Sequence, residues 1–212
     1  MVRGSGREIG RASARDKILD AALSLIRARG YAATSVDELC AAAGVTKGAF
    51  FHHFASKEEL AVAAADHWSR ATSQAFAAAP YQRHTDPLDR VLGYLDFRIS
   101  LLKRTVPEFT CLAGTMVQET YESNPSIRDA CAQAICDHAA KVEADIRAAI
   151  AKYGIDPPWT AASLALHMQA VLQGAFILAK AKGSAGVAAD SIGHLRRYVA
   201  LLFQASNPRQ KV

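Results

Sequence analysis

The chain has 212 residues, of which 50% are hydrophobic and 21% charged, and its formal net charge is +5. This composition is ordinary for a globular protein, and the mild basic excess is compatible with a polyanionic partner without requiring one. The four cysteines lack the CxxC pairing of zinc sites, no apolar run is long enough to span a membrane, and the basic N-terminus lacks the apolar core of a signal peptide. We therefore expect no metal, no cofactor, no membrane contact and a cytoplasmic location.

The first 30 residues divide into an arm and a helix. Residues 1–13 combine glycines and serines with three arginines, which predicts a flexible arm. Apolar residues recur at helical spacing over residues 14–29, with arginines in the last turn and Gly30 directly after it. A helix over residues 14–29 is predicted.

Residues 35–54, SVDELCAAAGVTKGAFFHHF, form the most informative pattern in the chain. Ser35 and Glu38 have the S-x-x-E spacing of a capping box, which starts a helix. Gly44 ends that helix at a position where a left-handed residue is usually needed, and Thr46 can cap the next one. The pattern predicts two short helices joined by a tight turn.

The second of these short helices has an anchored face and an outward face. Phe50 and Phe54 are four residues apart and would pack it against the rest of the domain. The outward face carries small, basic and imidazole groups, namely Lys47, Gly48, Ala49, His52 and His53. Such a face suits the DNA major groove, where lysine and histidine can donate to bases or phosphates. We interpret the stretch as a helix-turn-helix.

A longer helix is predicted over residues 56–78. Ser56 caps it, and Lys57 stands at its first turn, where an ammonium group and free backbone N–H groups can bind a DNA phosphate. At roughly 1.5 Å per residue the helix is long enough to leave the DNA-binding part and enter a second domain. We expect this helix to transmit movement between the two domains.

Beyond Pro80 the sequence predicts only helices. They cover residues 86–105, 108–122, 125–153, 159–182 and about 188–206. Because no strand-like alternation occurs, we predict an all-α fold with an arm (1–13), an N-terminal three-helix helix-turn-helix domain (14–60) and a helical second domain (61–212). The last two helices would form a hairpin that is apolar on more than one face, covered either by a second copy in a homodimeric four-helix bundle or by the chain's own helices.

Residues 13–60 resemble the DNA-binding domain of the TetR/AcrR family of bacterial transcriptional regulators. The matching stretch is ILDAALSLIRARGYAATSVDELCAAAGVTKGAFFHHFASKEEL, about a quarter of the chain. The resemblance implies a homodimer whose recognition helices bind successive major grooves of a palindromic double-stranded DNA operator. It also implies that residues 61–212 form an effector-binding and dimerisation domain, in which a small molecule swings the connecting helix and releases the DNA, so that the protein acts as a repressor.

The same resemblance assigns the DNA-contacting residues. They are Ser35, Val36, Thr46, Lys47, Gly48, Ala49, Phe51, His52, His53 and Lys57. Phe51 departs from the family, which commonly has a tyrosine there whose hydroxyl contacts a phosphate, so the contact here would be apolar. Asp37 adds a negative charge near the DNA-facing end of the first short helix. Arginines of the arm could enter the minor groove.

Candidate effector-binding residues are aromatic, sulfur-containing or polar groups within the apolar helices of the second domain. They are Phe97, Cys111, Met116, Tyr121, His167, Gln169 and Gln173, with Arg98, Phe109, Trp159, Met168 and Phe176 in a wider set. The polar groups are the more informative, since buried polar atoms need partners. The same residues would equally serve as plain core or line a dimer seam.

Two other interpretations were weighed against a ligand-released repressor. Cys111 lies in FTCLAG, a context similar to that of family members that sense oxidants or electrophiles, so a cysteine-based redox or electrophile-sensing repressor is the alternative. A constitutive nucleoid-binding protein would have no ligand cavity. No Ser–His–Asp signature, HExxH motif or Walker loop occurs, so we do not expect an enzyme.

Overall fold

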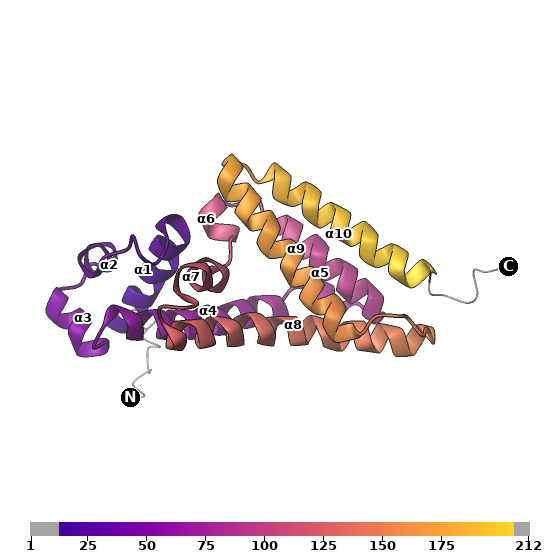
Figure 1. Ribbon diagram of the computed structural model, residues 1–212, viewed down its shortest axis with the longest axis horizontal. Coiled ribbons are helices and arrows are strands. Elements are labelled where there is room, and N and C mark those ends of the chain that lie inside the picture. Colours follow the sequence, from indigo (N-terminus) through magenta and orange to yellow (C-terminus); the bar gives the residue numbers. More distant parts are fainter. Residues whose placement is uncertain (1–12, 206–212) are drawn as a thin grey trace, which may run out of the picture.

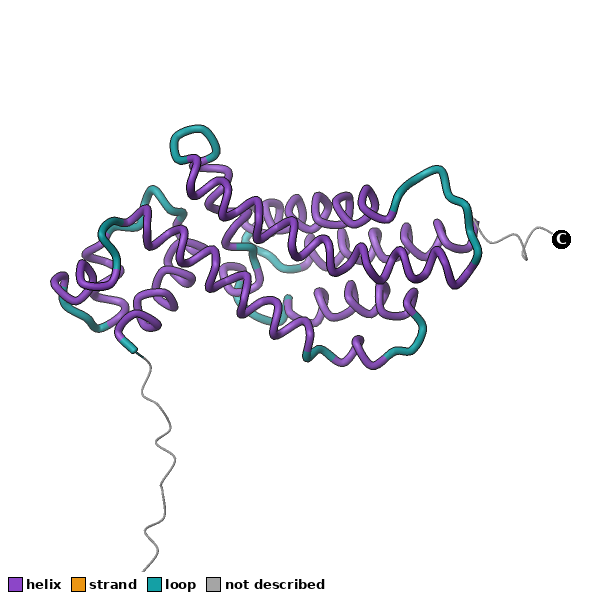
Figure 2. Tube along the Cα trace, turned by 90° about the horizontal axis from the view of Figure 1, so that it is seen from below, coloured by secondary structure: helices purple, strands orange, loops and turns teal. Residues whose placement is uncertain are grey.

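The computed structural model describes residues 13–205, which form helices joined by loops, with no strand among them (Figure 2). The elements are α1 (Ala14–Arg29), α2 (Val36–Ala43), α3 (Lys47–His53), α4 (Lys57–Ala77), the 3₁₀ helix η1 (Pro80–Arg83), α5 (Pro87–Leu101), α6 (Val106–Phe109), α7 (Leu112–Thr120), α8 (Pro125–Tyr153), α9 (Ala161–Lys182) and α10 (Gly186–Ala205). The predicted all-α class is confirmed. The predicted arm lies outside the described residues except for Ser13, whose side chain caps α1 by accepting from the N–H of Asp16.

Side-chain caps set the boundaries of α2, α3 and α4 where the sequence predicted them. Ser35 Oγ accepts from the N–H of Glu38 at 3.2 Å, and the Glu38 carboxylate accepts from the N–H of Ser35 at 2.9 Å. Gly44 has φ 64°, the left-handed conformation that turns the chain between α2 and α3. Thr46 and Ser56 each accept from a backbone N–H three residues ahead. These local bonds account for the helix-turn-helix geometry.

The predicted helix over residues 108–122 is interrupted, and this prediction was wrong. Thr110 and Cys111 have extended backbone angles, with ψ 159° and 124°, and separate α6 from α7. A capping box between Thr105 and Glu108 starts α6, and Cys111 Sγ caps α7 by accepting a backbone N–H at 3.3 Å. The break lets α7 pack against α1 and α4 (Figure 1).

A first hydrophobic core joins α1–α4 to α7 and the start of α8. Its buried members include Ile18, Leu19, Phe50, Phe54 and Leu60 together with Leu112, Met116, Ile127 and Cys131. The predicted boundary at residue 60 falls within α4, and the apolar packing crosses it. The 21-residue α4 then runs beside α8 toward the other end of the molecule (Figure 1).

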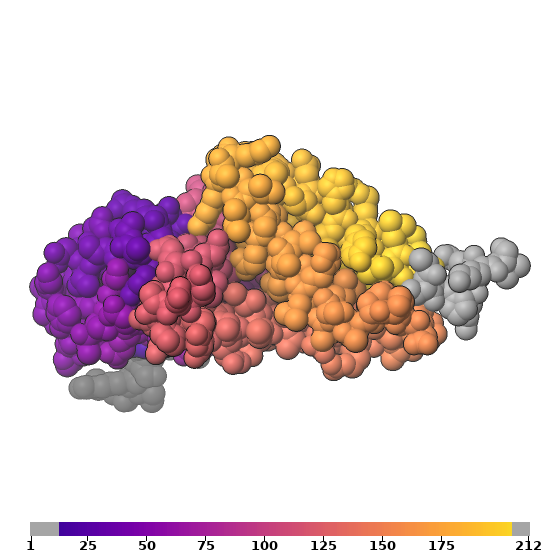
Figure 3. All heavy atoms as spheres, viewed as in Figure 1, coloured from indigo at the N-terminus to yellow at the C-terminus, as the bar shows by residue number. Residues whose placement is uncertain are grey.

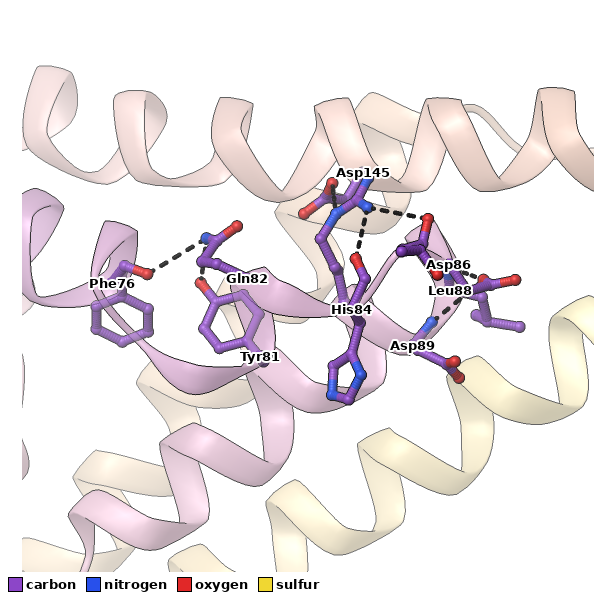
Figure 4. Close-up of polar contacts among 10 residues, drawn as sticks. Phe76, Tyr81, Gln82, His84, Asp86, Leu88, Asp89 and Asp145 are labelled. Carbon is purple, nitrogen blue, oxygen red and sulfur yellow. Dashed lines mark hydrogen bonds and ion pairs between the residues drawn. The ribbon is translucent and has the colours of Figure 1, made fainter.

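A second core lies between α5, α8, α9 and α10. Asp86 caps the N-terminus of α5, where its Oδ1 accepts from the N–H of Leu88 at 2.8 Å (Figure 4). Lys152 and Tyr153 at the end of α8 donate to Asp86 Oδ2 at 2.6 and 2.9 Å. Burial opposes ionisation of this carboxyl, but the four hydrogen bonds it accepts outweigh burial and lower its pKa to about 2.

By length and composition α9 is apolar enough to cross a membrane, so the expectation that no apolar run is long enough was wrong. In the fold it packs against α8 and α10, and 44% of the most apolar part of this helix is buried. A helix inside a protein core passes the same test, so this is weak evidence for a membrane span. Atoms of α9 and α10, in orange and yellow, lie on the surface seen in Figure 3. Leu166, Ile177 and Leu178 of α9 are about half exposed.

Candidate DNA interface and effector cavity

The recognition helix α3 is held from one side by two aromatic rings. Phe50 is 0% exposed and Phe54 is 2% exposed, and their ring centroids lie 5.9 Å apart. The opposite side is open, because Lys47, Gly48 and His52 are exposed while Ala49 and His53 are half-buried. Phe51 adds an apolar group to this side, since half of it is exposed.

Lys47 is paired with an acid on the neighbouring helix. Its Nζ lies 2.8 Å from Oδ1 of Asp37, and both side chains are largely exposed. The hydrogen bond and charge of Asp37 raise the pKa of Lys47. The unbound protein therefore already holds a carboxylate against the lysine that was expected to read DNA.

The remaining predicted DNA-contacting residues have local structural partners. Ser35 uses its hydroxyl in the α2 capping box, and Val36 packs on the first core. Lys57 Nζ donates to the carbonyls of Tyr31 and Thr34 at 3.1 Å each and lies 4.3 Å from the centroid of the Tyr31 ring. An ammonium group has three donors, so one remains for another acceptor.

A cavity of about 300 Å³ lies where α1, α4, α5, α8 and α9 meet the α6–α7 break. It receives four of the seven predicted effector-binding residues, Phe97, Cys111, Gln169 and Gln173, and three of the wider set, Arg98, Phe109 and Phe176. Several lining residues were not predicted, including Leu23, Arg27, Trp68, Phe76, Arg104 and His138. The sequence offered no local signal for them, since they face a common space only after α4 and α8 pack together.

Met116, Tyr121 and His167 lie outside the lining of this cavity. Met116 is fully buried in the first core, because the break at residue 111 turns α7 toward α1. Tyr121 follows the end of α7 and is 60% exposed. His167 is exposed and lies 5.5 Å from the ring of Tyr198 on α10. Trp159, from the wider set, packs on Phe203 instead.

A polar network occupies one wall of the cavity. The Tyr94 hydroxyl accepts from Arg98 Nε at 3.1 Å and from Gln169 Nε2 at 3.2 Å, and it lies 3.1 Å from Nε2 of His138. Arg98 also donates to His138 Nε2 at 2.8 Å. Burial and the charge of Arg98 lower the pKa of His138 to about 3, so its imidazole is neutral.

Two polar contacts tie the DNA-binding helices to the cavity walls. Arg27 on α1 donates to the backbone carbonyl of Glu108 at 2.8 Å, and its guanidinium lies 4.8 Å from the Trp68 ring centroid. The carboxylate of Glu119 on α7 accepts from the N–H groups of Tyr31 and Ala32, at 3.0 and 2.7 Å. Both contacts join residues more than 80 positions apart in the sequence.

Comparison with known families finds a match for the N-terminal part of the chain and another for the C-terminal part. Residues 18–64 match the bacterial regulatory proteins of the tetR family, and residues 87–195 match the tetracyclin repressor-like C-terminal domain. The chain belongs to the TetR family. It is therefore a transcriptional regulator with an N-terminal helix-turn-helix and a helical C-terminal domain, in a family of DNA-binding regulators rather than enzymes.

Individual relatives agree with this assignment. The HTH-type transcriptional repressor KstR2 of Rhodococcus jostii is 41% identical over 51 residues, which are 24% of this TetR-family chain and 25% of KstR2. The chain thus matches about a quarter of the length of that relative. A TetR transcriptional regulator from Chloroflexus aurantiacus superposes with TM-score 0.77 and 29% identity over 88% of this chain and 94% of its own. The reduced form of E. coli NemR gives TM-score 0.75 and 22% identity over 87% and 95%, a likeness of fold.

Proposed function

We propose that this TetR-family regulator is a homodimeric cytoplasmic repressor that binds a palindromic operator and leaves it when a small molecule occupies the cavity. The observation that carries the proposal is the composition of the cavity wall. Leu23 and Arg27 belong to α1, and Trp68 belongs to α4. A ligand in the cavity therefore touches α1, against which α3 packs, and α4, which follows α3 in the chain. KstR2 is named a transcriptional repressor, which supports repression rather than activation as the output of this regulator.

The proposed DNA contacts keep the sequence assignment and add the geometry of α3. Lys47 and His52 supply donors for bases or phosphates, Ala49 and Phe51 supply apolar contacts, and Lys57 has one donor left for a phosphate. Lys47 must exchange Asp37 for a DNA acceptor when the operator binds. Breaking the Lys47–Asp37 ion pair costs free energy, which lowers the affinity of the α3 surface for operator DNA.

The contacts of Arg27 and Glu119 are the proposed route from ligand to DNA. Arg27 lines the cavity and holds α1 to the end of α6, while Glu119 holds the loop before α2 to α7. A ligand that moves Arg27 or the start of α7 changes the position of α1 and α2 relative to α4. Two α3 helices in a dimer would then lose the spacing that successive major grooves require, which is about 34 Å.

The outer face of α9 and α10 is the proposed dimer interface. Its large apolar side chains are about half exposed, namely Leu166, Ile177, Leu178, Tyr198 and Leu201. Pairing two such hairpins would bury these residues in a four-helix bundle. Light scattering on the purified chain tests this: a dimer is expected, and Leu201→Glu is expected to yield a monomer that retains its helical circular dichroism. A wild-type monomer at micromolar concentration would contradict the proposal.

The operator is tested by a gel shift with the DNA upstream of the gene encoding this protein, at physiological salt with nonspecific competitor DNA. A discrete complex that survives the competitor and is lost on Lys47→Ala supports sequence-specific binding. Selection from a genomic library follows if the upstream fragment does not bind. Failure of every selected fragment to outcompete random DNA would rule out an operator-specific regulator.

Cys111 supports a second candidate, in which the cavity responds to an electrophile. Its sulfur caps α7 on the cavity wall and is half-buried, so a small molecule in the cavity can reach it. N-ethylmaleimide would then release operator DNA from the wild type but not from Cys111→Ser. Equal release from both would eliminate this candidate.

A further inference from the structure

The charged groups around the cavity are mostly cationic. Arg27, Arg98 and Arg104 line it, against a single acidic residue, Glu108. The Glu108 carboxylate is used in capping α6, where it accepts from the N–H of Thr105 at 2.9 Å and from its hydroxyl at 2.6 Å. Arg27 donates to two backbone carbonyls rather than to a carboxylate. The lining therefore has a formal charge of +2, three arginines less one glutamate.

Arg98 is the central cation of this set. Its guanidinium lies 4.4 Å from the Phe76 ring centroid and donates to a hydroxyl and to a neutral imidazole, and within residues 13–205 no carboxylate lies within ion-pair distance of it. Guanidinium has five N–H donors, and these two bonds leave three of them. A half-buried cation with only neutral partners is stabilised strongly when an anion arrives.

His138 on the same wall positions Arg98. Because arginine can only donate, His138 Nε2 must be the acceptor of the bond from Arg98, which places the proton of the neutral ring on Nδ1. That Nδ1 is buried and has no hydrogen-bond partner among the described residues. The imidazole is therefore a neutral acceptor that fixes the orientation of the Arg98 guanidinium beside the cavity.

Most of the remaining lining is apolar, and the polar side chains among it are Ser69, Thr72, Ser73, Gln169 and Gln173. The apolar part is rich in aromatic rings. It includes Trp68, Phe76, Phe97, Phe109 and Phe176 together with Leu101 and Ile135. A volume of about 300 Å³ is at the lower end of the range for small-molecule sites. These apolar walls suit a compact aromatic or branched aliphatic body.

We propose that the effector is a small organic carboxylate, whose apolar body lies between the aromatic walls and whose carboxylate accepts from the free N–H groups of Arg98. The assignment rests on the proposed function for its regulatory meaning and on the cavity alone for its chemistry. Two acceptor oxygens in one plane match the guanidinium fork, as in other arginine–carboxylate pairs. An organic cation is disfavoured by the lining charge, and a neutral molecule leaves the Arg98 charge unpaired.

The test compares 2-naphthoate, benzoate and 4-phenylbutyrate with their primary amides and with the corresponding amines, using calorimetry on the full chain. At least one acid is expected to bind while its amide and amine bind about tenfold more weakly or not at all. Arg98→Gln is expected to reduce acid binding by about tenfold to a hundredfold, and the exposed Arg128→Gln is the control that leaves it unchanged. His138→Gln is a second variant if Arg98→Gln unfolds, as circular dichroism would reveal.

The outcomes separate this proposal from the proposed function. Binding of the amide or amine as tightly as the acid, acid binding that survives Arg98→Gln, or no binding of any acid at millimolar concentration would overturn the carboxylate assignment. If an acid binds through Arg98 but the protein–operator complex persists in the gel shift, the carboxylate assignment is supported and the proposed release by an effector is contradicted. If only a cationic or neutral compound releases the operator, effector release stands and the carboxylate assignment fails.

Discussion

Glu119 holds the backbone of Tyr31, 88 residues earlier in the chain, with a 3.0 Å hydrogen bond from the Tyr31 N–H to the Glu119 carboxylate. The preceding residue must be small, because a Cβ at Gly30 would lie 2.5 Å from Glu119 Oε1, and Gly30 also has φ 95°. The loop between α1 and α2 thus depends on α7 for its conformation. Since α7 begins beside the cavity, this contact would be a short path from effector to DNA in the proposed mechanism.

Glu119→Gln is expected to lower stability and to weaken the effector response. The amide keeps one acceptor oxygen for two N–H groups and removes the charge, so we expect a loss of about 1–3 kcal/mol in urea unfolding. Operator release should require more effector, because α7 no longer holds the loop. The exposed Glu122→Gln on the same turn is the control, expected to change stability by less than about 0.5 kcal/mol. Wild-type stability and response in Glu119→Gln would show that the contact is dispensable.

Asp37→Asn is expected to tighten operator binding. The substitution frees Lys47 from its carboxylate partner and removes a negative charge next to the DNA-facing surface. Gel shifts at several salt concentrations should show higher affinity, while Lys47→Ala lowers affinity by about tenfold or more if the lysine reads a base. In the double variant the benefit of Asp37→Asn should shrink, since it acts partly through Lys47. An equal benefit with and without Lys47 would contradict the pairing as its cause.

Local signals in the sequence were sufficient for the DNA-binding end of the molecule. The caps at Ser35 and Thr46 and the left-handed Gly44 depend on residues within four positions, so they could be predicted with the correct helix boundaries. The bounds of α8, residues 125–153, were also predicted correctly, because Asn124 caps it and Pro125 starts it. These features need no knowledge of the tertiary structure.

The cavity depends on long-range packing and was predicted only in part. The rule that buried polar groups need partners singled out Gln169 and Gln173, which line the cavity, and also His167, which lies outside it. Met116 was a further candidate, and the turn at Cys111 directs it into the other core. Arg27 looked like an ordinary C-terminal cation of α1, and only its contact with residue 108 places it at the cavity. Periodicity shows that a helix has two faces, and it does not show which neighbour each face meets.

Lys57→Met is expected to affect both stability and DNA binding. Removing the ammonium leaves the carbonyls of Tyr31 and Thr34 without their donor, which should lower the free energy of unfolding by about 1 kcal/mol or more. If the third donor also binds a phosphate, the slope of log affinity against log salt should flatten by about one unit for all sequences. An unchanged salt slope together with lower stability would mean that Lys57 serves only the fold.

The free energy of unfolding should fall as the pH is lowered from about 6.5 toward 4, because of His138. Its folded pKa is about 3, while the unfolded side chain titrates near 6.5, so only the unfolded chain gains this proton between those values. The His138 contribution is complete above about pH 6.5 and declines by at most about 1.4 kcal/mol per pH unit below it. Urea unfolding at pH 7.5, 6.5, 5.5 and 4.5 measures this slope.

The slope should flatten in His138→Gln and persist in His84→Gln, an exposed control. Asp86 does not interfere, because its lowered pKa of about 2 withdraws stability only as the pH falls below about 4. A slope that survives His138→Gln would place the titrating group elsewhere and would remove the argument that His138 is neutral with its proton on Nδ1.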